Sequence, residues 1–295
     1  MRHLWNSALG LLLVTGLFLG LTPPLGKLAA EAGIPALLWA FVVSFGAGGV
    51  LLCLQGMRRS PLVITGRRLR YFVITAVLSY ALPNVLMFSA IPHLGAGYTS
   101  VMFTLSPVIT TLLTFLLGVH RPNAQGVLGI AIGFLGALMV ATTRGQIGQP
   151  AALSWIVFGL LIPLSLAAGN IYRSMDWPEG AGPLDLAIGS HLAAAAMLLM
   201  ALLIDGSASA MPRLVDIPLL VLAQIAVASS MFTLFFRLQM VGGPVYLSQI
   251  GYVGAAVGLL LGVLALGERY ALLTWAGAAI ITLGVVITTR ARGQP

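Results

Sequence analysis

Charged residues are scarce along the whole chain. Among its 295 residues are 15 Lys and Arg and 7 Asp and Glu, which is 7% in all, whereas a soluble domain carries roughly 25%. Hydrophobic residues make up 59%, and the mean hydropathy is +1.03. A water-soluble fold of this composition would expose large apolar patches. The chain is therefore predicted to be an integral membrane protein.

Groups that support catalysis or hold metals are nearly absent as well. Cys53 is the one cysteine and lies in an apolar run, so the sequence has no disulfide framework and no cysteine-based metal spacing. It has no HExxH motif and no paired acids inside an apolar run. We expect neither an enzyme nor a cofactor. All seven acids fall at the ends of apolar runs or between them, which argues against an antiporter of lipophilic cations.

Ten apolar runs are long enough to cross a bilayer, for which a helix needs about 20 residues. They do not alternate as the strands of a membrane barrel would. The first run also resembles a signal peptide, but no small-x-small cleavage site follows it, and its removal would leave nine spans. The predicted spans are 4–27, 35–56, 71–90, 97–118, 124–142, 153–173, 184–204, 217–236, 244–266 and 272–289.

The basic residues predict how the chain is oriented. With the N-terminus inside, 11 of the 15 lie on the inner side, many of them between Arg58 and Arg70. This is the positive-inside pattern, so both termini are expected in the cytoplasm and the protein in the cell (inner) membrane. No interleaved aromatic and basic stripe accompanies the net charge of +8, so nucleic acid is not an expected partner.

The chain repeats itself at an offset of 148 residues without a gap, across the fourth and fifth spans against the ninth and tenth. This indicates two five-helix repeats, residues 1–145 and 146–295. Because five is odd, the second repeat enters the membrane from the opposite side, an arrangement that recurs in transporters with a binding site near the midplane. The most informative pairs are Gly95 and Gly243, Tyr98 and Tyr246, Ser100 and Ser248, and Arg121 and Arg269.

These segments resemble the paired EamA repeats of the drug/metabolite transporter superfamily. The likeness is carried by "GAGYTSVMFTLSPVITTLLTFLLGVHR" with its Pro107, and by "GPVYLSQIGYVGAAVGLLLGVLALGER" with its terminal Gly267 and Glu268. The sequence departs from the family pattern at His120, where Glu is frequent, and at Ala255, where Pro is frequent. The resemblance implies an all-α membrane protein with ten transmembrane helices around a central cavity. It also implies export of amino acids, other metabolites or drugs.

Polar residues inside the spans are the candidate substrate contacts. Ser100, Thr104 and Thr111 share one face of the fourth span. Each hydroxyl either faces a cavity or donates a hydrogen bond to a backbone carbonyl of its own helix. The larger amides either join helices or contact substrate and water. The predicted substrate-binding residues are Asn84, Ser100, Thr104, Asn170, Ser248, Gln249 and Tyr252.

Other residues carry predicted roles in the transport cycle. Pro83, Pro107 and Pro163 are expected to kink their helices and to act as hinges. His191 lies well inside the seventh span and is a candidate for proton coupling, with a structural hydrogen bond as the alternative. Lys27 and Arg173 end corresponding helices of the two repeats. They either extend to the membrane interface or pair with a substrate carboxylate.

Glycine rows have a predicted packing role. Gly251, Gly254, Gly258 and Gly262 follow one face of the ninth span, and Gly126, Gly129, Gly133 and Gly136 do so in the fifth. Small residues let membrane helices approach closely.

The sequence thus predicts a monomeric exporter of small neutral or zwitterionic metabolites such as amino acids, working by alternating access. Its expected partners are the small-molecule substrate, the lipid bilayer and protons. The alternative is a drug or multidrug exporter of the same fold. A membrane enzyme would need a catalytic motif that is absent, and a scaffold or receptor would not need matched polar stripes in two repeats.

Overall fold

The computed structural model describes residues 7–57, 62–117, 124–143 and 145–292, and within them the chain is almost entirely helical. In chain order, the helices of the first half are α2 (Ala8–Glu31), α3 (Ala36–Met57), α4 (Gly66–Thr75), the π-helix η1 (Ala76–Ala81), α5 (Leu82–Leu94), α6 (Ala96–Met102), the 3₁₀-helix η2 (Phe103–Leu105), α7 (Ser106–Leu116) and α8 (Ala124–Thr142). A two-stranded hairpin of β1 (Gly145–Gln146) and β2 (Gln149–Pro150) follows. The second half comprises α9 (Leu153–Met175), α10 (Pro183–Asp205), the 3₁₀-helix η3 (Ser207–Asp216), α11 (Pro218–Leu264) and α12 (Leu272–Arg292).

Eight helical stretches within the described residues are long and apolar enough to span a membrane, which makes this a multi-pass membrane protein. They coincide with the first eight predicted spans. The ninth and tenth predicted spans correspond to the shorter apolar helices Gln249–Leu264 and Leu272–Gly284. By the length criterion, the described residues therefore contain eight spans and not the ten that were predicted. The eighth and ninth predicted spans are joined in α11, which has 47 residues. A straight helix of that length would measure about 70 Å, more than twice the roughly 30 Å of hydrocarbon.

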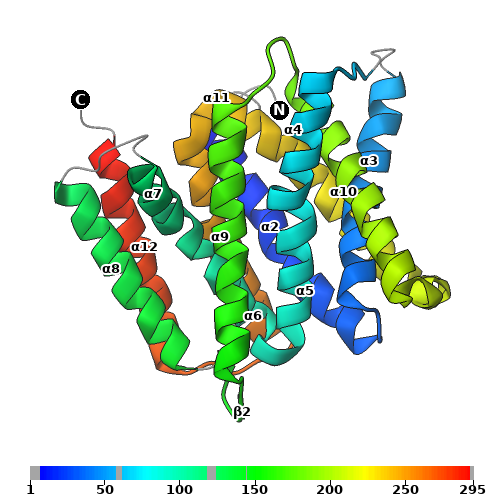
Figure 1. Cartoon of the computed structure of the whole chain (residues 1–295). Helices are drawn as coiled ribbons and strands as arrows, with labels where there is room; N and C mark the ends of the chain where they lie inside the picture. Colours follow the sequence, from blue (N-terminus) through cyan, green and yellow to red (C-terminus); the bar gives the residue numbers. More distant parts are fainter. Residues whose placement is uncertain (1–6, 58–61, 118–123, 144, 293–295) are drawn as a thin grey trace.

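The helices pack in pairs across the molecule (Figure 1). Helices α8 and α12 lie together at one edge, and α3 and α10 lie together at the other. Between these pairs, α2 contacts α11, α6 contacts α11, and α9 contacts α5 and α7. Helix α2 begins and α12 ends on the same side of the molecule, and the hairpin lies on the opposite side. We call these the terminal side and the hairpin side.

Glycines produce the closest helix contacts, as the sequence predicts. A Cβ atom built on Gly136 of α8 would lie 2.7 Å from the backbone nitrogen of Ile281 in α12. One built on Gly254 of α11 would lie 3.0 Å from Leu19 in α2. Because lipid tails are as apolar as the side chains, close packing rather than burial from water holds such helices together. The packing role of these glycines is confirmed.

Candidate functional site

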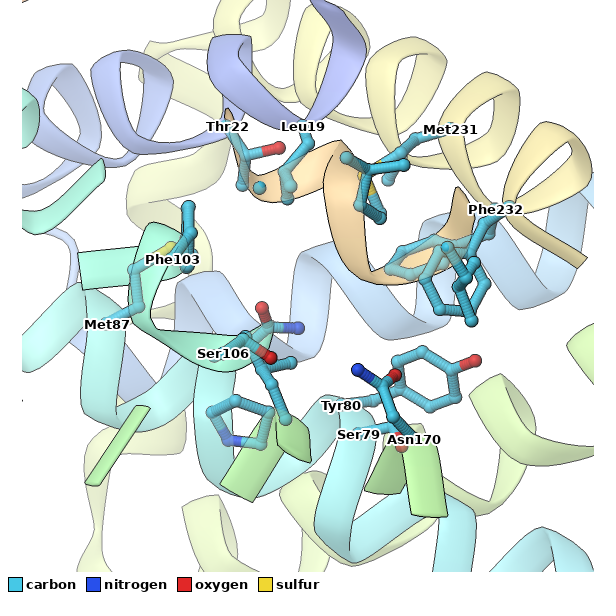
Figure 2. A pocket seen from close by; sticks show the side chains of 18 of the residues that line it. Leu19, Thr22, Ser79, Tyr80, Met87, Phe103, Ser106, Asn170, Met231 and Phe232 are labelled. Carbon is cyan, nitrogen blue, oxygen red and sulfur yellow. The ribbon is translucent and has the colours of Figure 1, made fainter. Parts of the chain in front are cut away.

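A pocket of about 90 Å³ lies between the middle helices. This is several times the space that one water molecule needs. Leu19, halfway along α2, and Leu166 of α9 are in its wall, which places the pocket midway along the helices. Figure 2 shows Thr22 and Leu19 on one side and Ser79, Tyr80 and Asn170 on the other. Most of the wall is apolar, and its apolar residues include Val43, Met87, Phe103, Met231, Phe232 and Phe235.

A π-helical turn, η1, interrupts the third span where it meets the pocket. The N–H of Leu82 donates to the carbonyl of Val77, five residues back, instead of to Leu78. The freed carbonyl of Leu78 accepts a hydrogen bond of 2.8 Å from the Ser165 hydroxyl of α9. Pro83 follows directly; it has no N–H, and its ring disfavours an α-helical turn before it. Such turns frequently occur at functional sites, and this one places Ser79 and Tyr80 in the pocket wall.

The fourth span is also interrupted at the pocket. The 3₁₀-helix η2 immediately precedes Pro107, and the N–H of Ser106 donates to the carbonyl of Phe103. The helix is thus irregular just before Pro107, whereas the predicted kink and the role of Pro107 as a hinge stay predictions. Phe103 and Ser106 line the pocket, and so does Gly251 of α11. A Cβ atom on Gly251 would be 2.7 Å from the Phe103 carbonyl oxygen.

We expect Gly251→Ala to destabilise the protein by roughly 1–3 kcal/mol, the usual cost of overpacking a close contact. The added methyl group would meet backbone, which cannot move aside as a flexible side chain can. The measurement is the thermal unfolding temperature in detergent. Gly49→Ala on α3 is the matched control, because a Cβ atom there meets nothing within 4 Å. Equal unfolding temperatures for the two variants would contradict the expected clash.

Arg173 is the most unusual residue of the pocket wall. Its side chain is 1% exposed, and its guanidinium donates to Ser79 Oγ and, at 2.5 Å, to Asn170 Oδ1. Its Cζ atom lies 4.9 Å from the ring centroid of Phe235. Nε has no hydrogen-bond partner among the described residues. The alternative that Arg173 extends to the membrane interface is wrong, because the guanidinium turns back into the bundle and bonds the π-helical turn.

Of the predicted substrate contacts, the pocket brings together Asn84 and Asn170. The Nδ2 atom of Asn84 is buried without a partner among the described residues. Ser100 and Thr104 do not line the pocket; their hydroxyls donate to the carbonyls of Ala96 (2.8 Å) and Val101 (2.6 Å), which was the alternative explanation.

The predicted contacts of the ninth span lie away from the pocket wall. Gln249 and Tyr252 are half-buried in α11 but are not among the residues that line it. The side chain of Ser248 lies outside the described part of the structure. A role of these residues in substrate binding stays a prediction.

The predicted hinges and the histidine are placed as follows. Pro83 lines the pocket, and α9 runs unbroken through Pro163. His191 is fully buried beside the pocket, with its ring centroid 4.1 Å from that of Tyr80 and 4.0 Å from that of Phe232. Neither of its nitrogens has a hydrogen-bond partner in the described residues, so the structural hydrogen bond offered as the alternative is not found there. Proton coupling through His191 stays a prediction.

A buried ion pair closes the hairpin side of the helix bundle. Lys27 Nζ, at the end of α2, lies 2.8 Å from Glu268 Oε1, whose side chain is 0% exposed. Glu268 also accepts hydrogen bonds from the N–H groups of Ala96 (2.7 Å) and Gly97 (2.9 Å) at the start of α6 and from the Tyr270 hydroxyl (2.5 Å). Burial raises the pKa of Glu268, but these hydrogen bonds together hold it below its usual value. We call this cluster the hairpin-side clamp.

A second set of ion pairs lies on the terminal side. Arg70 pairs with Asp176 at 2.9 Å, and Arg68 lies 3.7 Å from Asp185. Gln55 donates to Asp185 at 2.7 Å. The two arginines tie α4 to the end of α9 and to α10, and Gln55 ties α3 to α10. Hydrogen bonds from the Tyr172 hydroxyl and from Arg70 hold the pKa of Asp176 below its usual value.

Several pocket residues could not be recognised from the sequence. Ser79 and Tyr80 are ordinary members of an apolar run until the π-helical turn directs them inward. The aromatic residues Phe232 and Phe235 are indistinguishable from lipid-facing ones by composition. The sequence shows a charged residue at Arg173, ahead of the acids Asp176 and Glu179, but it does not show that this side chain is buried.

Comparisons with known proteins agree with this architecture. No curated protein matches the sequence. A solved crystal structure, described only as that of a protein, is similar to the chain with a TM-score of 0.64 at 18% identity, covering 97% of each chain. At that identity the likeness shows the fold alone, and it extends over both halves. Residues 6–142 match the model of the EamA-like transporter family. Over these residues, just under half of the chain, the sequence is similar to a family of membrane transporters.

Proposed function

We propose that this protein moves small metabolites across the cell membrane by alternating access, and that the central pocket is the substrate site. The observation that carries the proposal is the pocket itself, in which Asn84, Asn170 and Arg173 are held at mid-depth within an apolar bundle. Polar groups at that depth are costly and are characteristic of transport paths. The hairpin-side clamp and the Arg70–Asp176 pair lie beyond the pocket on opposite sides, where gates are required.

We also propose that the chain consists of ten spans in two inverted repeats. Under that symmetry the fourth and ninth, second and seventh, and fifth and tenth spans should pair with each other. The contacts of α6 with α11, α3 with α10, and α8 with α12 support this. Contacts of α2 with α11 and of α9 with α7 are a matching pair of the same kind. The basic residues then put the terminal side in the cytoplasm.

The proposed substrates are small neutral or zwitterionic metabolites, with amino acids first, and the proposed direction is export. The small pocket volume favours such molecules. Drug efflux is the second candidate, because the wall is rich in aromatic and other apolar side chains such as Phe103, Phe232 and Phe235. Flat apolar drugs would stack on such a wall without needing the polar groups.

The test is uptake and efflux by purified protein in proteoliposomes, with and without a pH gradient. Amino acids and other small metabolites form one panel, and lipophilic drugs form the other. Movement of the first panel is expected, and movement of the drugs alone would establish the second candidate. A response to the gradient would support proton coupling through His191. If neither panel moves above empty liposomes, the proposal fails.

Asn84→Leu should lower transport about tenfold, which corresponds to one hydrogen bond with substrate. Because the Asn84 Nδ2 atom has no partner within the described protein, the same change should leave the unfolding temperature unchanged or slightly higher. The two readouts separate a substrate contact from a structural one. Unchanged transport would remove Asn84 from the site.

A further inference from the structure

Arg173 has no acidic partner among the residues that the structure describes. All seven acids of the chain lie in the described residues, and none of them is within 4.0 Å of its guanidinium. Three of the acids pair with basic residues other than Arg173: Glu268 with Lys27, Asp176 with Arg70, and Asp185 with Arg68. The partners that the described structure offers Arg173 are two neutral oxygens and the Phe235 ring.

An unpaired buried cation is expensive for a folded protein. Arginine is almost never fully buried unless it is paired, and removing a charge from water costs several kcal/mol even after relaxation. The side chain also cannot shed its charge, because guanidinium stays protonated. The two neutral oxygens and the Phe235 ring compensate this charge only in part, so an anion that enters the pocket would gain from contact with Arg173.

The rest of the pocket limits the kind of anion. Among its lining residues in the described structure, Arg173 is the one Lys or Arg, and no acid is present. One cation matches a monoanion, and the planar guanidinium fork matches a carboxylate in two-pronged geometry. The surrounding wall is apolar, with Leu166, Met231 and Phe232 among its residues.

We propose that the pocket binds small carboxylates with an apolar body and that Arg173 holds the carboxylate. This rests on the proposed transport function and deepens it by naming the substrate class. Ser79 and Asn170 orient the guanidinium through their hydrogen bonds. Apolar amino acids and their desamino analogues both belong to the class, since no acid in the pocket demands an ammonium group.

The test uses the wild-type protein and ligands that share an apolar body. Leucine, phenylalanine and methionine are each supplied as the amino acid, the desamino carboxylate, the amide and the phosphate ester of the corresponding alcohol. Binding is measured as the ligand-dependent rise in unfolding temperature in detergent, and transport is measured in proteoliposomes. Forms with a carboxylate should bind and move, and the amides should bind at least 100-fold more weakly.

Variants then assign the selectivity to Arg173. Arg173→Gln should weaken carboxylate binding about 100-fold and remove the preference over the amide. Arg173→Lys, which keeps the charge and loses the fork, should retain part of the affinity. Arg290→Gln removes the same charge at an exposed site on α12 and should bind as wild type. If Arg173→Gln does not fold, the wild-type comparison of acids with amides still decides the matter.

Four outcomes would overturn the inference. Amides that bind as well as acids, or a folded Arg173→Gln protein that still prefers acids, would leave the transport function standing without this anchor. Phosphate esters that bind more tightly than carboxylates would replace the proposed class. If no ligand in any form binds or moves, the proposed function fails together with the inference.

Discussion

Glu268→Gln is expected to destabilise the protein by about 3 kcal/mol. The carboxylate is fully buried and pairs with Lys27 at 2.8 Å, and removing one member of a buried pair typically costs roughly 3–5 kcal/mol. The lower end applies because the Lys27 side chain is 18% exposed and can regain water. The N–H groups of Ala96 and Gly97 at the start of α6 also lose a charged acceptor. Thermal unfolding in detergent measures the effect.

Glu31→Gln is the matched control for this change. Glu31 lies 4.0 Å from the same Lys27 nitrogen, but its side chain is 58% exposed. Exposed pairs are worth roughly 0–1 kcal/mol, so this variant should unfold close to the wild-type temperature. If the two variants lost stability equally, Lys27 would not depend on the buried carboxylate.

The contribution of Glu268 should also depend on pH. Its pKa in the folded protein lies below its ordinary value of 4.5, so the unfolded chain takes up the proton first as pH falls. The stabilisation is therefore complete above about pH 4.5 and is lost as pH falls through the lowered pKa. Unfolding temperatures of wild type and Glu268→Gln should differ at neutral pH and converge in acid. A constant gap down to the lowest measurable pH would contradict the assignment.

Pro83→Ala is expected to lower transport at least tenfold with little loss of stability. Alanine restores an N–H group at position 83 and removes the ring that opposes an α-helical turn, so the π-helical turn η1 can relax into α-helix. One residue of helix corresponds to about 100° of rotation. Ser79 and Tyr80, which line the pocket from this turn, would then point elsewhere. Transport and unfolding temperature are measured together.

Pro163→Ala serves as the comparison, because α9 runs unbroken through Pro163. Without a π-helical or 3₁₀ turn to relax, the substitution should change transport only slightly. A larger loss from Pro163→Ala than from Pro83→Ala would show that the proline of α9, and not the π-helical turn, is the hinge of the transport cycle.

The sequence alone determined that this is a multi-pass helical membrane protein, because apolar runs of about 20 residues have few other stable solutions. It also indicated the glycine packing faces, because a residue without a side chain lets a neighbouring helix approach closely. Two of the seven predicted substrate contacts, Asn84 and Asn170, line the pocket. Amide side chains inside the predicted spans were the strongest indication of the pocket in the sequence.

Only the tertiary structure decided which polar groups face the pocket. Hydroxyls such as those of Ser100 and Thr104 can bond their own helix, so a polar stripe does not by itself mark a cavity. The π-helical turn rotates Ser79 and Tyr80 out of the register that a regular helix predicts. Pairing is likewise a property of the packed bundle: Glu268 lies 241 residues from Lys27, whereas Arg173 is left without an acid in the described part of the chain. Charge compensation depends on distances that a linear pattern does not contain.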